Sequence, residues 1–136
     1  MTQEELSGYR QLRRDRHETE QIIKDIETSI DGLRAAVLDG LPHGSGRRRG
    51  LDEIVMRYEA QTERYLNKLA DINSAMQRIE DAVGSLPPKE RDTMFQYYIA
   101  GQRKKTFYQV ARITHYSERQ VRRYHERAMI ILQTWP

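Results

Sequence analysis

Three arginines occupy one side of the last periodic segment of the chain, close to its start. At about 100° per residue, a helix over residues 117–133 turns Arg119, Arg122, Arg123 and Glu126 outward. The opposite face is apolar and consists of Val121, Tyr124, Ala128, Ile131 and Leu132, with His125 at its edge. A face that serves solubility alone usually mixes Glu with Lys, whereas arginine reads guanine edges in the major groove. The pattern therefore favours DNA recognition over a merely solvated surface.

The residues around the start of this segment predict a helix-turn-helix. Ser117 and Gln120 form a capping box, and Tyr116 is placed to form a hydrophobic staple with Val121. A preceding helix is expected over residues 106–114, so that the turn between the two helices is short, as the motif requires.

The turn departs from the usual pattern at two positions. Thr114 stands where an apolar residue is expected, and His115 takes the position that glycine usually fills. Histidine tolerates a positive φ better than bulky or β-branched residues do, so the turn is still expected to form.

A basic loop, "QRKK", precedes these two helices at residues 102–105. It lies beside the expected DNA face, where a chain can approach the phosphate backbone, so we assign phosphate contacts to Arg103, Lys104 and Lys105. We also assign phosphate contacts to Ser117 and Gln120 at the start of the last helix.

Two prolines in "GSLPPKERD" predict the start of a further helix, because proline is tolerated in a first turn but not in a helix interior. This helix is expected from about Pro88 to Ala100. It should bury Met94, Phe95, Tyr98 and Ile99, and Gly101 should follow its C-terminus.

The first part of the chain predicts a long antiparallel helical hairpin of coiled-coil type. Apolar residues alternate at intervals of three and four, most regularly at Leu51, Val55, Tyr58, Thr62, Tyr65, Leu69, Ile72, Met76, Ile79 and Val83. Similar spacing runs from Tyr9 to Val37 and weakens at Arg16 and Thr19, where the helix would fray or meet another partner. The glycine-rich stretch from Asp39 to Gly50 predicts the connecting loop.

Alternatives stay open for this hairpin. It is either only a packed pair of helices or an oligomerisation arm, because Ile22, Ile54, Leu66 and Ala75 lie off the main seam and could face a second hairpin. The arginines of "GRRRG" at 46–50 are either solvated or an auxiliary phosphate contact. We divide the chain into this hairpin, residues 1–85, and a DNA-binding domain, residues 86–136.

Composition and charge exclude several classes. The chain has no cysteine, so disulfides and thiolate metal sites are excluded and a cytoplasmic location is expected. No apolar run approaches the roughly 18 residues of a membrane span, and the start of the chain is unlike a signal peptide. Residues 1–86 hold 13 basic and 16 acidic side chains, whereas residues 87–136 hold 10 basic and 4 acidic ones. The basic second part fits an anion-binding domain.

Catalysis is not expected. The histidines His17, His43, His115 and His125 are scattered without the spacing of metal ligands. No glycine-rich phosphate loop follows a strand pattern. The sequence therefore predicts neither an enzyme nor a bound metal or cofactor.

Residues 86–132 resemble the fourth conserved region of bacterial sigma factors, through "LPP.ER", then "VA", then "S..QVRR…RA". The whole chain, with a long helical part before that region, resembles phage transcriptional regulators of the ArpU/RinA type. "YYIAG" at 97–101 and "YSERQVRRYHERA" at 116–128 carry this second resemblance. The resemblance implies a sigma-like helix-turn-helix in a phage or prophage activator of late or packaging genes. On the sigma pattern, Glu118, Arg119, Arg122 and Arg123 take the base-facing positions, whereas Thr114 and His115 depart from its "LG" turn.

The sequence thus predicts an all-α regulator of transcription that binds double-stranded DNA at a promoter or operator as a homo-oligomer. Its expected location is the cytoplasm of a bacterial host cell, in association with the nucleoid, and RNA polymerase is a further candidate partner. Two other functions stay open. One is a phage DNA-packaging component resembling a small terminase subunit, and the other is a helical module that binds RNA polymerase without touching DNA.

Overall fold

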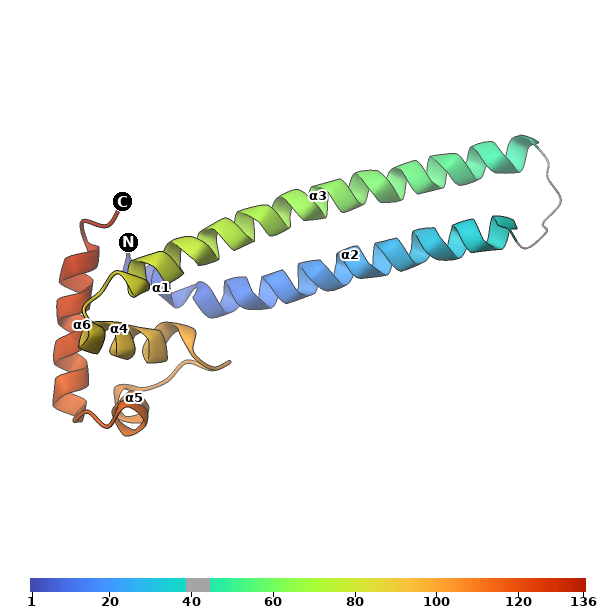
Figure 1. The fold of residues 1–136 in the computed structure, drawn as a ribbon. Helices are drawn as coiled ribbons and strands as arrows, with labels where there is room; N and C mark the ends of the chain where they lie inside the picture. The colour runs from blue at the N-terminus through green and yellow to red at the C-terminus, as the bar shows by residue number, and fades with distance from the viewer. Residues whose placement is uncertain (39–44) are drawn as a thin grey trace. The chain divides into compact units, whose positions relative to one another are not determined.

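The computed structural model describes residues 1–38 and 45–136, which form helices and contain no strand (Figure 1). The elements are α1 (Gln3–Ser7), α2 (Tyr9–Leu38), α3 (Ser45–Gly84), α4 (Pro88–Met94), the π-helix η1 (Phe95–Ile99), α5 (Phe107–Thr114) and α6 (Glu118–Leu132). The predicted all-α class is confirmed. Two compact units are present: Asp15–Ile72, called the helical pair below, and Met1–Arg14 with Asn73–Pro136, called the head. The head contains residues from both sides of the expected boundary at residue 85.

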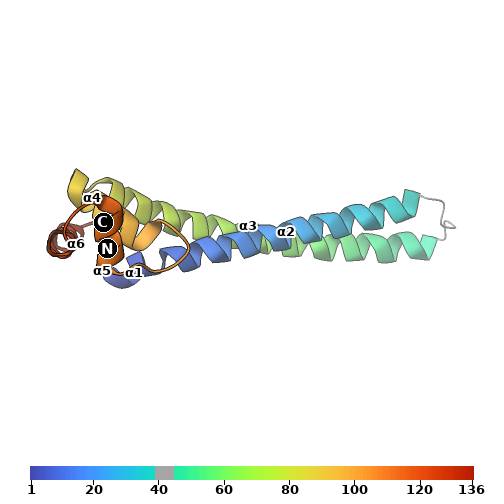
Figure 2. The ribbon, with the colours of Figure 1, turned by 90° about the horizontal axis from the view of Figure 1, so that it is seen from below.

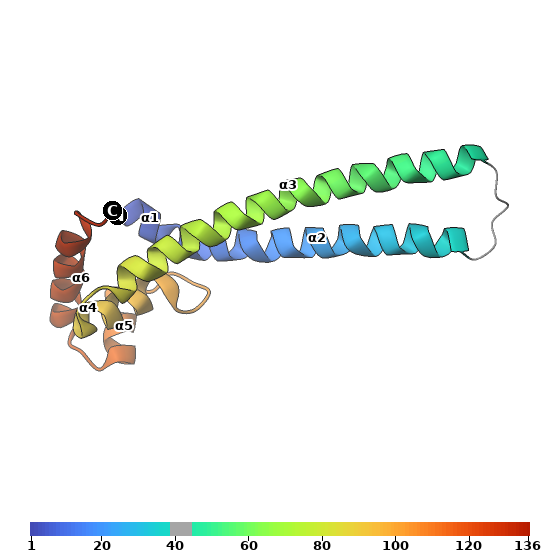
Figure 3. The ribbon, with the colours of Figure 1, turned by 45° about the horizontal axis from the view of Figure 1, so that its top comes forward.

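In the helical pair, α2 and α3 run in opposite directions (Figure 3). The 3-4 stripe of the sequence marks the packed face: Ile23, Ile26, Ile30 and Ile72 are buried, whereas Leu51, Val55, Tyr58, Thr62, Tyr65 and Leu69 are half-buried. Helix α2 continues through Arg16 and Thr19 without a break. Thr19 is buried there. Its hydroxyl donates to the carbonyl of Asp15 at 2.7 Å, and this bond within the helix allows the polar group to be buried.

Helix α3 begins earlier than its glycines suggest. A loop was expected as far as Gly50, but the backbone of residues 45–50 forms the first turns of α3, so that part of the prediction is wrong. A glycine inside a helix costs about 1 kcal/mol relative to alanine, which weakens a helix without forbidding it, and the arginines between the two glycines are good helix formers. Residues 39–44, including His43, lie outside the described residues, and the role of the arginines in "GRRRG" stays a prediction.

The helices of the head all contribute buried side chains. Helix α6 packs against both α4 and α5, and Figure 2, which looks along α6, shows these two helices on the same side of it. The fully buried side chains include Leu6 of α1, Met76 of α3, Met94 of α4, Val110 of α5, and Val121 and Leu132 of α6. The N-terminal segment belongs to the same unit as the C-terminal helices, and the amino group of Met1 donates to the carbonyl of Leu132 at 3.1 Å.

The helix expected from Pro88 to Ala100 changes from an α-helix to a π-helix halfway along its length. Its second part is the π-helix η1, in which the amide of Ala100 donates to the carbonyl of Phe95 at 2.8 Å. Met94, Tyr98 and Ile99 are buried as predicted, but Phe95 is 45% exposed, so its predicted burial is wrong. The wider π turn brings Met94 and Ile99 onto one face and leaves Phe95 beside it. Gly101 follows with the positive φ of 75° that ends the helix, as predicted.

Candidate nucleic-acid interface

The connection between α5 and α6 consists of His115, Tyr116 and Ser117. His115 adopts the left-handed conformation with φ 62°, the conformation that the sequence required of this non-glycine residue. Tyr116 packs against the cluster that contains Val121, as the predicted staple requires. The turn therefore changes the direction of the chain directly before the first turn of α6.

Capping boxes begin both helices. The amide of Gln120 donates to the Ser117 hydroxyl at 3.1 Å, and the amide of Ser117 donates to the Gln120 side-chain oxygen at 2.9 Å. Thr106 and Gln109 make the same pair of bonds at the start of α5, which sequence reasoning missed although "T-x-x-Q" is its signal. The side chains of Ser117 and Gln120 thus have a local structural role, and a phosphate contact from them stays a prediction.

The outward face of α6 presents the charged residues that were predicted to read bases. Glu118, Arg119, Arg122, Arg123 and Glu126 are all exposed, whereas Val121, Tyr124, Ala128 and Leu132 are buried. The division into two faces is the one expected from the sequence, with one correction. Ile131 is 44% exposed, because it lies at the margin of the apolar face, next to the fully buried Leu132.

Arg122 is oriented by two neighbours. Its guanidinium donates to the carboxylate of Glu118 at 3.0 Å, one helical turn earlier, and lies over the Phe107 ring with 5.0 Å to the ring centroid. An exposed pair of this kind contributes at most about 1 kcal/mol to stability. Its effect is to restrict the directions in which Arg122 can point, and to give α5 and α6 a shared charged edge.

The basic loop borders an open groove of about 690 Å³. The groove is lined by Gly101, Gln102, Arg103, Lys104 and Lys105 on one side and by Gln109, Arg112 and Ile113 of α5 on the other. Arg103, Lys104 and Arg112 are exposed. Arg112 was not predicted as a contact. Its sequence signal is its position in the last turn of α5, the helix that directly follows the basic loop. The groove concentrates positive charge where a polyanion could lie.

Lys105 differs from its two basic neighbours. Its ammonium donates to the carbonyls of Gln96 and Ala100 at 3.2 and 2.5 Å, at the C-terminus of η1. Burial lowers the pKa of Lys105, and the nearby charges of Arg10 and Arg13 lower this pKa further. Lys105 therefore caps a helix, and Arg103 and Lys104 are the better placed of the three predicted phosphate contacts.

Two arginines that sequence reasoning did not connect with this region also reach the end of η1. The guanidinium of Arg10, which is buried, donates to the carbonyls of Gln96, Tyr97, Ala100 and Gly101 at 2.8–3.4 Å. Arg13 donates to the carbonyl of Ile99 at 3.1 Å and to that of Gly101. The only signal in the sequence is the basic run "RQLRRDR". Because these contacts join residues 86–91 positions apart, local periodicity could not place them.

His125 and Tyr98 form a hydrogen bond of 2.6 Å that joins α6 to η1. Burial lowers the pKa of His125. Burial, together with Tyr97, raises the pKa of Tyr98 to about 12. The phenol therefore keeps its proton, and the bond joins it to Nε2 of His125, whose tautomer decides which of the two groups donates. The rings of Tyr97 and Phe107 also contact His125, so this cluster fixes the position of α6 against η1 and α5.

Neither metal nor membrane chemistry is visible in the described part of the chain. Within residues 1–38 and 45–136, no group of three or more His, Cys, Asp or Glu side chains is arranged to hold a metal ion. None of the helices in these ranges has the length and hydropathy that crossing a membrane requires. His17 and His115 are exposed on the surface.

Comparison with known proteins assigns no family: no protein-family model matches this chain, and no curated protein and no solved structure is significantly similar to it.

Proposed function

We propose that this chain is a sequence-specific regulator of transcription that binds double-stranded DNA with a helix-turn-helix formed by α5 and α6. The observation that carries the proposal is the exposed cluster of Arg119, Arg122 and Arg123 in the first turns of α6, immediately after the left-handed residue His115. In a helix-turn-helix, these first turns of the second helix face the base edges. Arginine is the side chain most often used there for guanine.

The residues around α6 support a surface that binds DNA rather than one that is only solvated. The groove beside the basic loop supplies further exposed cations from Arg103, Lys104 and Arg112. Cations of this kind contact phosphates and set the register of the protein on the duplex, and arginines on the helix then read the sequence. The resemblance to ArpU/RinA-type regulators leads us to propose activation of phage late or packaging genes in a bacterial cytoplasm.

The test compares operator and scrambled duplexes. The operator is first located by footprinting on the DNA that flanks the gene. Arg119→Ala or Arg123→Ala should then cost about 1–3 kcal/mol on the operator and less on scrambled DNA, because phosphate contacts survive. Arg→Lys should not restore binding, since a point charge cannot reproduce the planar guanidinium. Arg64→Ala, an exposed arginine of α3, is the matched control and should change neither affinity.

Equal losses on both duplexes for every variant would reduce α6 to an electrostatic patch. Binding to RNA polymerase without any shift of DNA would select the polymerase-binding module instead. A ring of roughly eight or more subunits in solution would favour the small-terminase alternative, because closed rings follow from head-to-tail interfaces.

We also propose that the helical pair assembles the protein into a homo-oligomer. Ile22, Ile54, Met56 and Leu66 are 37–67% exposed on two helices that bury only one face each. A second copy that covered these side chains would remove apolar area from water. Leu66→Glu combined with Ile54→Glu should dissociate the full chain in sedimentation experiments while helicity is kept. Unchanged sedimentation would remove the helical pair as the assembly surface.

A further inference from the structure

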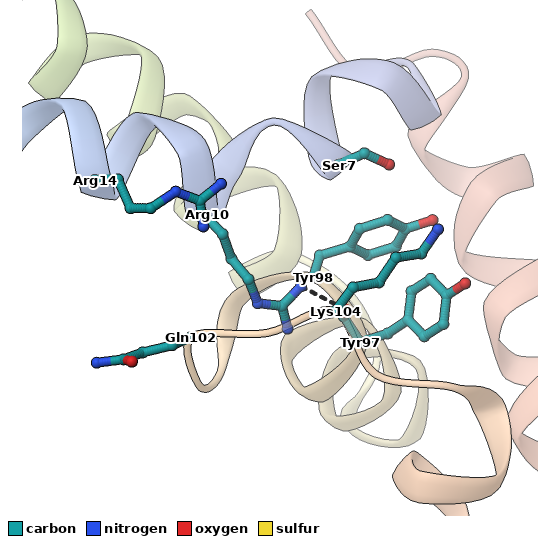
Figure 4. Close-up of a pocket in the computed structure, with 7 residues that line it drawn as sticks. All are labelled: Ser7, Arg10, Arg14, Tyr97, Tyr98, Gln102 and Lys104. Atoms are coloured by element: carbon teal, nitrogen blue, oxygen red, sulfur yellow. Dashed lines mark hydrogen bonds between the residues drawn. The ribbon is translucent and has the colours of Figure 1, made fainter.

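A small pocket opens in the head where the N-terminal segment meets the basic loop (Figure 4). Its volume is about 130 Å³, and its walls include Ser7 of α1, Arg10 and Arg14 of α2, the rings of Tyr97 and Tyr98, and Lys104. A water molecule occupies about 30 Å³ in the liquid. The pocket therefore has room for one small polyatomic ion and little else.

The pocket carries a concentration of positive charge. Arg10, Arg14 and Lys104 contribute three cations, and no acidic side chain is among the described residues that line it. Burial lowers the pKa of Arg10, and repulsion from Arg13 and Arg14 lowers this pKa further. The groups that face Arg10 are backbone carbonyls, which carry only partial charges. An anion in the pocket would relieve this repulsion.

The cations of the pocket have different tasks. Arg10 donates to four carbonyls through its guanidinium, so its side chain forms a fixed part of the pocket wall. Arg14 is exposed and donates through Nε and one Nη2 hydrogen to the side-chain oxygen of Gln11 at 3.3 and 2.7 Å, which leaves Nη1 for a ligand. Lys104 and Ser7 are exposed residues. Ser7, Arg14 and Lys104 come from three separate segments and line the same pocket, where the Lys104 side chain lies beside the Tyr98 ring (Figure 4). Charged donors of this kind suit an ion with several oxygen acceptors.

We propose that this pocket binds a phosphate group and that, when the protein binds DNA, it holds a backbone phosphate outside the contacts of α5 and α6. The second half of the inference rests on the proposed function. Lys104 lines this pocket and also the open groove beside α5, so the basic loop borders both hollows. A phosphate backbone that followed the loop would reach both hollows. The N-terminal segment would then be part of the binding surface.

Inorganic phosphate tests the pocket itself. In the full chain, replacing chloride by phosphate at equal ionic strength should raise the thermal midpoint by a few degrees, because a ligand that binds only the folded state stabilises it. The double variant Arg14→Ala with Lys104→Ala should lose this rise and keep its midpoint in chloride. Ser7→Asp, which places a carboxylate at the pocket, should lose the rise as well. The double variant Arg64→Ala with Lys68→Ala removes the same charge from exposed positions of α3 and should keep it.

A rise that is equal in all four proteins would overturn the proposal, since it would then be a general salt effect. Absence of any rise in the wild-type chain at tens of millimolar phosphate would overturn it too.

The salt dependence of DNA binding identifies the source of the phosphate. For Arg14→Ala, the slope of log affinity against log salt should fall by about 0.9, because one backbone phosphate is no longer neutralised, while Arg64→Ala keeps the wild-type slope. If the phosphate-specific rise depends on Arg14 but the DNA slope does not, the pocket takes a free phosphorylated ligand. If the protein binds no DNA at all, the proposed function fails while the measurement with inorganic phosphate still decides whether the pocket is an anion site.

Discussion

The head and the helical pair bury their apolar side chains to different extents. In the head, Met94, Val110, Val121, Ala128 and Leu132 have exposed fractions of 0%. In the helical pair, the best buried apolar residues are isoleucines that keep 7–8% exposure, and the stripe of α3 from Leu51 to Leu69 is only half-buried. Helices need a second layer on each apolar face that they bury. The helices of the head cover one another in this way, whereas a pair of helices can cover only one face of each helix.

Polar contacts follow the same division. In the head, Arg10 and Arg13 tie segments that are far apart in the sequence. In the helical pair, the hydrogen bonds of Thr28, Ser29 and Thr62 go to carbonyls four residues earlier in the same helix. An exposed ion pair, Arg34 with Glu59 at 3.4 Å, connects α2 with α3. The difference teaches that contacts between distant segments hold the head together, whereas the helical pair depends on contacts within each helix and leaves apolar side chains exposed.

The largest expected effect compares two leucines. Leu6→Ala should cost about 2–5 kcal/mol, because the side chain is fully buried and a cavity would remain. Leu69→Ala, at a half-buried position of α3, should cost about 1–2 kcal/mol. Urea unfolding of dilute protein measures both, with the fluorescence of Trp135, the single tryptophan, reporting on the head and circular dichroism on all helices. An equal or larger effect of Leu69→Ala would reverse the comparison.

A second pair of variants compares cations. Arg10→Ala should destabilise the head by about 2–3 kcal/mol, because hydrogen bonds from a charged donor are strong and the four carbonyls would be left without their partner. Arg10→Lys should restore little, since an ammonium cannot span these carbonyls. Arg34→Ala, which breaks an exposed pair, should cost less than about 1 kcal/mol. Similar destabilisation by Arg10→Ala and Arg34→Ala in urea titrations would contradict the role given to Arg10.

The smallest effect concerns pH. Because burial lowers the pKa of His125 in the folded state, its contribution is complete above the ordinary value of about 6.5 and is lost as the pH falls below that value. His125→Gln should therefore flatten the fall in stability of the head below pH 6.5 relative to wild type. His17→Gln in the helical pair is the control and should leave the profile unchanged, since that side chain is exposed. The measurement is the urea midpoint of Trp135 fluorescence from pH 5 to 8; parallel profiles for wild type and His125→Gln would exclude His125.

Local signals predicted much of the candidate interface. The capping box at Ser117, the terminating residue Gly101 and the outward arginines of α6 each depend on residues within a few positions of one another, so the sequence contains the whole cause. Phe95 and Ile131 were assigned wrongly to the core because a helical period cannot anticipate a π turn or the margin of a face. The capping of η1 by Arg10 and Arg13 was missed because nothing local pairs an arginine with a carbonyl some 90 residues away.

The head is discontinuous in sequence, and this has a consequence for its synthesis. Arg10 and its partner carbonyl at Ala100 are separated by 90 residues, so the head cannot close until most of the chain has left the ribosome. Helices α2 and α3 run in opposite directions (Figure 3), so their pairing alone would bring Asp15 and Ile72, the first and last residues of the helical pair, to the same end. That pairing shortens the effective loop between the two parts of the head and lowers the entropy lost on closing it. We therefore expect that lengthening or shortening both helices of the pair by whole heptads leaves the closure of the head intact.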